Sequence, residues 1–378
     1  MSTLVRPSRL AAAVALAALG IFALPCLAAD FDAGSNGSYG PLTITANTTL
    51  DLPPDGVFHC TTITVNQGAT LRFNKNPLNT PVVLLAQGDV TINGAIDVSG
   101  ANNAGAIGGV GGPGGFDGGH GGFGPSAPAS RGGDGYGPGR GLNANNQRAA
   151  AYAQAAASNA RTYGNVLIFP LIGGSGAAGF DGNPGYGGGG GGGAILIASN
   201  TRITVNGTIN AQGGSAPYGG GSGGAIRLVA PTGGGGGNLR ADGNSSGANG
   251  RVRIDCTEPL AFRNLTLQGS VTRGTRMFAL PAAQPRLHFV SVAGQAIPVS
   301  AAAGVSFELP AGSYPKQSVV LRGEGFTGQI PLQLVVIPEH SASTVYDLTL
   351  NANANPPEVS TSITLPEGEP VRLEAWTR

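Results

Sequence analysis

The chain has 378 residues, a formal net charge of +1 and only 11% charged residues. This low and balanced charge argues against a protein that binds nucleic acid through an electrostatic patch. Glycine contributes 66 residues and proline 27, but the glycines are concentrated between short apolar runs, so uniform low complexity is not indicated. The length suffices for two or three domains.

Residues 1–28 predict a secretory signal peptide. Arg6 and Arg9 form its positive region, and residues 10–24 form an apolar core too short to span a bilayer with ordinary flanks. Small residues precede a cleavage point after Ala28, and cleavage after Ala29 fits nearly as well. No later run is apolar enough to span a membrane. We therefore expect an exported protein, extracellular or on the cell surface, with the periplasm as the alternative.

Residues 29–284 predict a parallel β-helix. One short pattern of alternating apolar residues begins at Val82, Ala194 and Ala225, and a partial copy covers residues 251–255. One copy cannot bury its apolar face alone, so successive copies must stack as a solenoid. A β-sandwich of hairpins is the alternative, but hairpins would not place the same pattern in parallel register. Further strands are expected at residues 42–44, 50–52, 62–65, 70–73 and 265–267.

The copies align residue by residue. Two inward apolar positions recur in all four copies, and two more positions recur in the two longest copies. The first position is Val83, Ile195, Ile226 and Val252, the second is Leu85, Ile197, Leu228 and Ile254, and the others are Ile92 with Val205 and Gly94 with Gly207.

Residues 101–193 interrupt the repeat as a long glycine-rich insertion. Few of its side chains could offset the entropy of ordering it. The insertion is therefore either partly disordered or built from closely packed glycine strands of the polyproline II type. Within it, residues 145–161 are rich in alanine and lack glycine and proline, which predicts a helix. Residues 166–172 supply an apolar plug.

Residues 285–378 have a different composition, with less glycine and more regular alternation. Their spacing of strands and turns predicts a small β-sandwich of the immunoglobulin type. The expected strands are residues 286–292, 305–309, 318–322, 330–337, 344–350 and 371–376.

Two cysteines remain after signal cleavage, Cys60 and Cys256. An even count in an oxidising compartment favours a disulfide. Stacking in chain order opposes it, because the two would lie roughly 15–20 Å apart and a disulfide needs Cα atoms within about 7 Å. Either both thiols are free and buried, or the first coil packs beside the last. We favour the disulfide.

Familiar catalytic motifs are weak in this sequence. Ser222 and Ser245 match a nucleophile elbow in spelling only, because no helix follows either residue. His120 lacks the paired carboxylates that glycoside hydrolysis requires. Asp117, Asp134 and Asp181 are isolated, whereas calcium-binding repeats need tandem copies. We expect no catalytic residue, no metal site and no cofactor.

Arginine is the residue type whose positions in the repeat suggest a binding site. Arg227 and Arg253 occupy equivalent positions beside inward apolar residues, so both should point outward on neighbouring coils. An outward basic strip could bind an anionic polysaccharide. A solvated face with Asp255 and Asp242 as partners is the plainer alternative. The expected ligand-binding residues are Arg227, Arg253, Arg251, Arg240 and Arg202.

The chain resembles exported bacterial glycine-rich proteins in which a pectin-lyase-like right-handed parallel β-helix carries a glycine-rich insertion. The resemblance covers nearly all of the mature chain. It implies the fold and the exported location, but it implies no established activity and carries over no catalytic residue. The matching stretches are residues 84–94, 170–176, 187–197, 221–230 and 285–294.

The sequence thus favours a secreted or cell-surface structural or adhesive protein that contacts glycans or extracellular matrix. The alternative is a polysaccharide lyase or glycoside hydrolase on the same scaffold, because solenoids host both kinds of protein. An outward acid–base cluster in a groove would favour the enzyme.

Overall fold

The computed structural model describes residues 31–123, 131–156, 159, 161–258, 260–281, 285–298, 305–313 and 315–378. The predicted signal peptide lies outside these residues. The described chain is built mostly of parallel strands, followed by antiparallel strands at the C-terminus. One short 3₁₀ helix, η1 (Ala144–Asn146), interrupts them.

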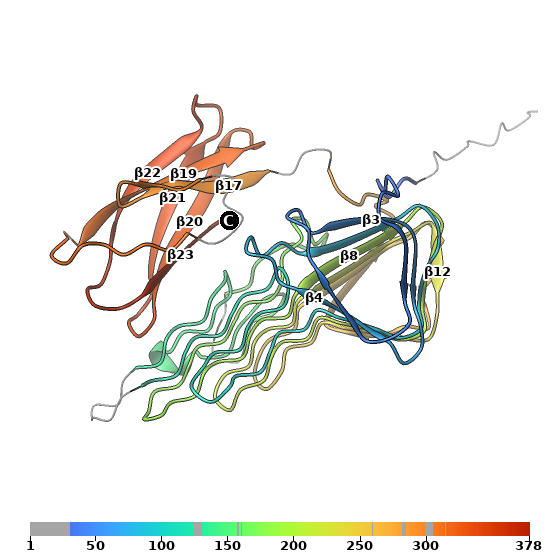
Figure 1. Cartoon of the computed structure of the whole chain (residues 1–378), viewed down its shortest axis with the longest axis horizontal. Helices are drawn as coiled ribbons and strands as arrows, with labels where there is room; N and C mark the ends of the chain where they lie inside the picture. The colour runs from blue at the N-terminus through green and yellow to red at the C-terminus, as the bar shows by residue number, and fades with distance from the viewer. Residues whose placement is uncertain are drawn as a thin grey trace, which may run out of the picture. The chain divides into compact units, whose positions relative to one another are not determined.

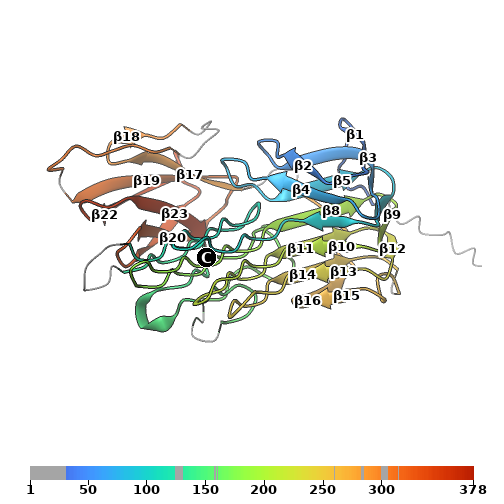
Figure 2. The same ribbon diagram turned by 60° about the horizontal axis from the view of Figure 1, so that its bottom comes forward.

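The parallel strands form two sheets that stack coil upon coil, consistent with a β-helix (Figures 1 and 2). In the larger sheet, long β3 (Val57–Val65) pairs with both β5 and β6 and so joins two columns of strands. The larger sheet contains β1 (Gly40–Ile44), β3, β5 (Val82–Ala86), β6 (Val90–Ile92), β8 (Ala194–Ser199), β9 (Arg202–Val205), β11 (Ala225–Val229), β12 (Thr232–Gly234), β14 (Arg251–Asp255) and β16 (Ser270–Gly274). The second contains β2 (Thr48–Asp51), β4 (Thr70–Asn74), β7 (Ala95–Asp97), β10 (Thr208–Asn210), β13 (Asn238–Arg240) and β15 (Thr266–Gln268).

The register between the later copies is the predicted one. Ile226 pairs with Ile195 and Val252, as expected for stacked coils. Leu228 likewise pairs with Ile197 and Ile254, and Ile92 pairs with Val205. These side chains fill one continuous apolar core inside the coils.

Within the first copy, β5 is shifted by one residue from the prediction, whereas β6 keeps the predicted register. Val82 pairs with Ile195 and Leu84 pairs with Ile197, so these two face the core. The predicted equivalence of Val83 and Leu85 with the later inward residues is therefore wrong. The apolar run of β5 is continuous and lacks the alternation that would fix which face points inward.

Val83 and Leu85 instead join a second apolar cluster on the outer face of the larger sheet. Leu196, Ala198 and Val229 from the following coils belong to the same cluster. Chain segments on either side of the coil region cover it, through Phe31 and Ala33 at one end and Met277, Ala279 and Leu280 at the other. The central strands are consequently buried on both faces.

The glycine-rich segments pack into one array beside the coils (Figures 1 and 2). We call it the glycine array; it comprises the described residues of 98–193 together with 211–224 and 241–250. Its central segment, residues 187–193, donates main-chain hydrogen bonds with a period of three. Gly188 and Gly191 donate to Gly119 and Phe116, Gly189 and Gly192 donate to Gly219 and Ser222, and Gly190 and Gly193 donate to Ala101 and Val98.

The carbonyl groups of the same segment accept from further neighbours. Gly188 and Gly191 accept from the segment at 109–112, Gly189 and Gly192 accept from the segment at 174–177, and Gly190 accepts from Gly214. Six neighbouring segments thus surround one central strand. A three-residue period is that of the polyproline II helix. Of the two alternatives for the insertion, the packed glycine strands are confirmed for the described residues.

Backbone contact at this distance requires glycine. A Cβ atom on Gly191 would lie 2.0 Å from the carbonyl oxygen of Gly174. A Cβ on Gly192 would lie 2.1 Å from the carbonyl oxygen of Ala211. Side chains would therefore push the neighbouring main chains apart and break the hydrogen bonds between them.

The predicted helix at residues 145–161 is wrong. Apart from the single turn of η1, the described part of this segment contains bends but no helix, and it bonds to the glycine array. Ala150 donates its main-chain amide to Gly220, and Ala151 donates to Gly139. Hydrogen bonds to other segments have replaced the helical ones, so tertiary contacts override the helix propensity of alanine.

The C-terminal region is a β-sandwich of two antiparallel sheets around its own apolar core. The segment at 305–309, predicted as a strand, is not one. β22 was not predicted, because most of its residues are Ser and Thr and its alternation is weak. One sheet contains β17 (Arg286–Val292), β18 (Gln295–Ala296), β19 (Lys316–Glu324) and β22 (Glu358–Thr364), and the other contains β20 (Gln329–Pro338), β21 (Thr344–Asn351) and β23 (Val371–Thr377).

The predicted disulfide is absent, and Cys60 and Cys256 are both free and buried. Cys60 lies on β3 and Cys256 directly follows β14, four strand steps away in the larger sheet. At about 4.8 Å per step, the separation is about 19 Å, far beyond disulfide reach. Burial raises the pKa of the Cys60 thiol to about 11, and burial likewise raises that of Cys256.

The packing of the glycine array predicts a position-dependent cost of adding one methyl group. Gly191→Ala should lower the free energy of unfolding by about 1–3 kcal/mol or more, because the new Cβ meets only main-chain atoms. Gly236→Ala is the control, since nothing lies within 4 Å of its Cβ position. It should change stability by less than about 0.5 kcal/mol. Chemical denaturation of both variants measures the difference, and equal stability would contradict the close packing.

Candidate functional site

The two central arginines of the predicted basic strip are buried. Arg227 and Arg253 pair across β11 and β14, and both point away from the apolar core, as predicted. Only 2% of Arg227 and 7% of Arg253 is exposed, however. The segment after β16 covers them, and Arg227 donates to the main-chain oxygens of Phe278 and Ala279. The prediction of an outward, ligand-accessible pair is wrong.

Asp255 lies close to both guanidinium groups beneath this cover and is the one carboxylate paired with them among the described residues. Its Oδ1 accepts from Arg253 Nε at 3.0 Å, and its Oδ2 lies 3.5 Å from Arg227 Nη2. The main-chain amide of Arg276 also donates to Asp255. Burial lowers the pKa of the Arg227 guanidinium, and the charge of Asp255 opposes that shift. This is a closed structural cluster whose charges are already paired.

The other three arginines do not extend the pair into a strip. Arg251 donates to the main-chain oxygen of Tyr163 at 2.8 Å and lies over the ring of Tyr152. Arg240 is on β13 of the second sheet, and Arg202 is exposed on β9. The five predicted residues therefore occupy three different places on the coils.

The motif residues weighed in the sequence are engaged in structural contacts. Ser222 is fully buried, and its hydroxyl accepts from the main-chain amide of Ser175. His120 accepts from the amide of Gly108 through Nδ1. Within the described ranges, no three His, Cys, Asp or Glu side chains gather as metal ligands would. The described residues also include no helix with the length and apolar character needed to cross a membrane.

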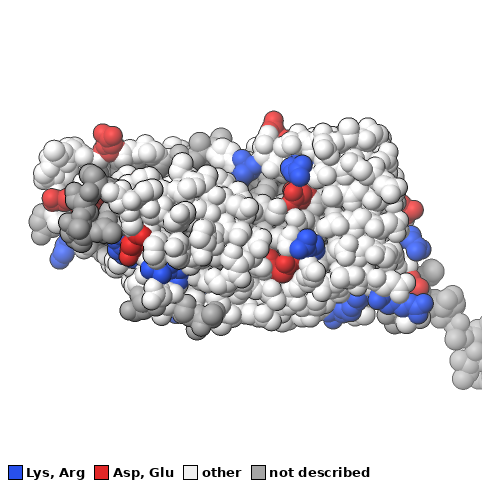
Figure 3. Space-filling model, turned by 90° about the horizontal axis from the view of Figure 1, so that it is seen from below, with Lys and Arg blue, Asp and Glu red and all other residues white. Residues whose placement is uncertain are grey.

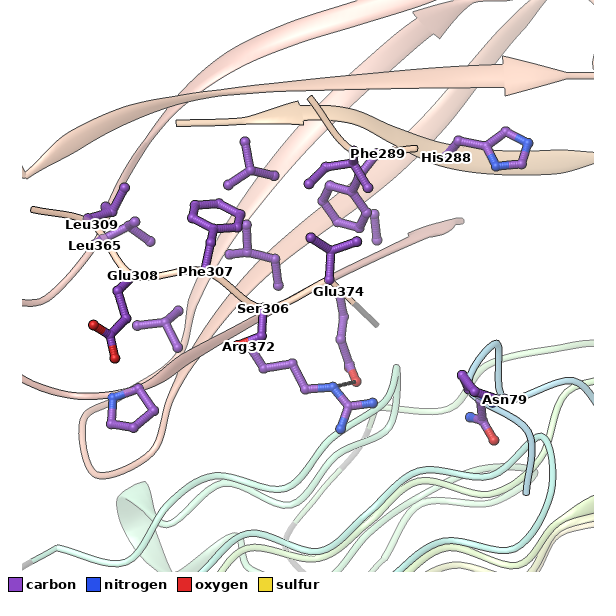
Figure 4. A pocket seen from close by; sticks show the side chains of 18 of the residues that line it. Asn79, His288, Phe289, Ser306, Phe307, Glu308, Leu309, Leu365, Arg372 and Glu374 are labelled. Carbon is purple, nitrogen blue, oxygen red and sulfur yellow. Dashed lines mark ion pairs between the residues drawn. The ribbon is translucent and has the colours of Figure 1, made fainter. Parts of the chain in front are cut away.

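A cleft of about 1650 Å³ lies beside the sandwich and is lined mainly by apolar side chains (Figure 4). Phe289, Phe307 and Leu365 are among them, and Arg372 and Glu374 supply an ion pair at 3.3 Å. Glu374 also accepts from the amide of Gly137 at 2.8 Å. Burial raises the pKa of the Glu374 carboxyl, while Arg372 and the hydrogen bond from Gly137 oppose the shift. These charged groups thus join the sandwich to the glycine array.

Two aspartates of the glycine array complete this contact. Asp134 accepts from the main chain and the hydroxyl of Ser343, at 3.0 and 2.8 Å. Burial alone would raise the pKa of Asp134, but hydrogen bonds from Asn143 and Ser343 and the charge of Arg131 hold it below the usual value. Asp117 bridges Lys75 and Arg372. The isolated aspartates of the sequence are therefore structural partners.

The ends of the glycine loops form the best candidate for a functional site. Loops at 102–107, 180–186, 215–220 and 244–247 turn back there, away from the strands. Their exposed aromatic rings and short polar side chains make up what we call the tip surface. Its members are Asn102, Asn103, Phe180, Tyr186, Ser215, Tyr218 and Ser245.

Aromatic rings of two loops stack at the tip surface. The rings of Phe180 and Tyr218 are nearly parallel, with centroids 3.8 Å apart and 11° between their planes. Tyr186 lies 5.6 Å from Tyr218 at a tilt of 46°. Arg148 packs over the other face of the cluster, 4.7 Å from the centroid of Phe180. Tyr186 and Tyr218 are nevertheless 44% and 47% exposed.

A shallow polar hollow of about 440 Å³ is formed partly by the loop that carries Tyr218. Asn102, Asn103, Ser215 and Ser245 line it, together with Pro217, the residue before Tyr218. The hydroxyls of Ser215 and Ser245 are 2.7 Å apart, and Asn102 accepts from the amide of Ser215 at 2.7 Å. Its amide nitrogen has no partner among the described residues.

Stacked rings beside amides and hydroxyls can hold a flat, polyhydroxylated ligand. The faces of aromatic rings carry negative charge and attract polarised C–H groups, while Tyr hydroxyls and Asn amides exchange hydrogen bonds. The sequence reasoning missed Tyr186 and Tyr218 because they lie in different loops. The available signal was an aromatic residue following a proline turn inside a glycine-rich segment.

A comparison of the chain with models of protein families, with curated proteins and with solved structures found no match. No relative therefore lends this chain a function.

Because the cluster around Asp255 is buried, we expect a substitution there to change the stability of the protein and not its binding of a ligand. Asp255→Asn should destabilise the protein by about 3–5 kcal/mol, because it leaves two buried guanidinium groups without a counter-charge. Arg202→Ala removes an exposed arginine of the same coils and should change stability by less than about 0.5 kcal/mol. Thermal unfolding compares the two, and a fully stable Asp255→Asn protein would show that the arginines are not buried.

Proposed function

We propose that this protein is an exported adhesive protein that binds uncharged glycans of a cell surface or extracellular matrix through its tip surface. The observation that carries the proposal is the stack of exposed Tyr218 on Phe180, beside Tyr186 and the polar hollow. Exposed aromatic clusters of this kind are typical of recognition surfaces.

The support beneath the tip surface favours binding without large rearrangement. Each loop returns into a lattice of main-chain hydrogen bonds, such as that from Gly221 to Gly214 across the loop of Tyr218. Gly105 accepts both from Asn103 at 2.9 Å and from the amide of Gly187, which fixes Tyr186 beside the hollow. A site held in place before binding loses less conformational entropy when the ligand arrives.

The charges near the tip surface favour an uncharged ligand over the anionic polysaccharide expected from the sequence. Arg148 is the cation of the aromatic cluster, and two of its five N–H groups bond to side-chain amide oxygens. Its Nε donates to Asn143 at 2.9 Å and its Nη1 donates to Asn146 at 2.6 Å. The seven members of the tip surface are themselves uncharged, so the tip surface offers a ligand ring stacking and neutral hydrogen bonds.

The adhesive function is preferred over the lyase or hydrolase because of where the charged groups lie. Glycoside hydrolysis needs two accessible carboxyl groups across a groove. On the larger sheet, the carboxylate of Asp255 is covered and paired with arginine. We further assign the coils to the pectin-lyase-like β-helix and the sandwich to the immunoglobulin-like class, in line with the stacked register and the two packed antiparallel sheets.

Binding to an array of uncharged and anionic glycans tests the proposal. The native protein should bind uncharged glycans, and Tyr218→Ala should weaken that binding roughly tenfold or more, because it removes half of the stacked pair. Tyr39→Ala is the matched control, since Tyr39 is 46% exposed on the coils, outside the tip surface.

The control should bind as the native protein does, and unfolding curves should show that both variants are folded. Failure of the native protein to bind any uncharged glycan would refute the proposed function. An equal loss in Tyr39→Ala would refute the tip surface as the site.

A further inference from the structure

The second parallel sheet presents an unbroken row of polar side chains to solvent. Five neighbouring strands, β4, β7, β10, β13 and β15, each contribute one member in register. We call this set the polar row. Its members, in order across the strands, are Arg72, Asp97, Asn210, Arg240 and Gln268.

Alternation along each strand places these residues outside. The preceding residues, among them Leu71, Ile96 and Leu239, are fully buried in the core of the coils. The side chains of the row are exposed or half-buried. Figure 3 shows the molecule from below, where a few acidic and basic side chains lie near the middle and others lie toward the two ends. A ligand could therefore reach the row along its whole length.

The charges within the row sum to +1, from two arginines and one aspartate, and Asp242 beside the row brings the sum to zero. Arg72 lies 3.3 Å from Asp97, and Arg240 donates to Gln268 at 2.7 Å. Beside the row, Asp242 lies 3.8 Å from Arg240 and accepts from Gln212 at 2.7 Å. Its Oδ1 is buried and has no hydrogen-bond partner within the described part of the chain, so a ligand would meet its other oxygen. Together with Asp242, the row therefore has no net charge, and its exposed and half-buried side chains retain donors and acceptors.

We propose that the polar row binds a linear, uncharged polysaccharide that lies across the strands. Guanidinium, carboxylate and amide groups are planar and offer two polar atoms side by side, which suits a pair of neighbouring sugar hydroxyls. Strand spacing repeats these groups at about 4.8 Å and gives a row about 19 Å long. A regular row of this length fits an extended polymer better than a single sugar.

This site is separate from the tip surface, and its test does not depend on the tyrosines. Native affinity gels containing mannan, β-glucan or xylan measure retardation of the folded protein. At least one of the three polymers should retard it, and short oligosaccharides of the same sugar should compete poorly. Arg240→Ala should weaken retardation about tenfold, as expected for the loss of a charge-assisted bidentate contact.

Two matched variants distinguish a specific contact of the Arg240 guanidinium group from a general effect of positive charge. Arg240→Lys keeps the charge but loses the planar fork, so it should weaken binding nearly as much as Arg240→Ala. Arg202→Ala removes an exposed arginine from the neighbouring face and should bind normally.

The proposal is overturned if none of the three polymers retards the native protein, or if Arg202→Ala is as impaired as Arg240→Ala. It is also overturned if Arg240→Lys binds normally, because charge alone would then explain the effect. Loss of retardation in Tyr218→Ala with none in Arg240→Ala would assign polymer binding to the tip surface.

Discussion

Main-chain hydrogen bonds between segments without side chains hold this molecule together beside its coils. A strand with side chains pairs with two neighbours in a sheet, whereas the segment at 187–193 bonds to six. Such contact is possible because a Cβ on Gly191 or Gly192 would collide with a neighbouring carbonyl group. The lattice thus requires the unusually high glycine content, because main chains pack directly against one another where side chains pack in other proteins.

The lattice limits the places in the array where side chains can contact a ligand. Glycine segments offer no side-chain chemistry of their own, so any recognition within the array must come from the turns that join them. The loops that carry Tyr186 and Tyr218 do this, and they differ from ordinary surface loops because both ends of each are tied into the array. Binding residues on loops held by a rigid scaffold are a common arrangement. Here the scaffold is made of backbone, and the coils serve to anchor it.

Much of the fold followed from the sequence, since the inward positions of Ile226 and Leu228 recur and can be aligned without a structure. The sequence was less informative where a position depends on distant covering segments. The predicted direction of the Arg227 side chain, away from the apolar core, was correct. Its burial depends on Phe278 and Ala279, which lie some 50 residues later in the chain. The disulfide was favoured from compartment alone, although stacking in chain order already opposed it.

The helix predicted at residues 145–161 was wrong, and the tip surface was not predicted. Both failures have a related cause. Local propensity favours a helix at 145–161, but the amides of that segment bond to glycine segments such as those of Gly139 and Gly220. Similarly, nothing local to Tyr186 indicates that its loop returns beside that of Tyr218. Residues in a lattice of this kind contact segments that are far away in the sequence. The periodicity of the sequence does not indicate which segments these are.

Hydrogen–deuterium exchange of the native protein tests the backbone lattice most directly. The amides of residues 189–193 should exchange as slowly as those of β8 and β11, because each is hydrogen-bonded within the array. The loops of the tip surface should exchange faster. Rapid exchange at 189–193, at the rate of exposed loops, would show that the glycine segments are not a hydrogen-bonded array, and the platform proposed for glycan binding would have no support.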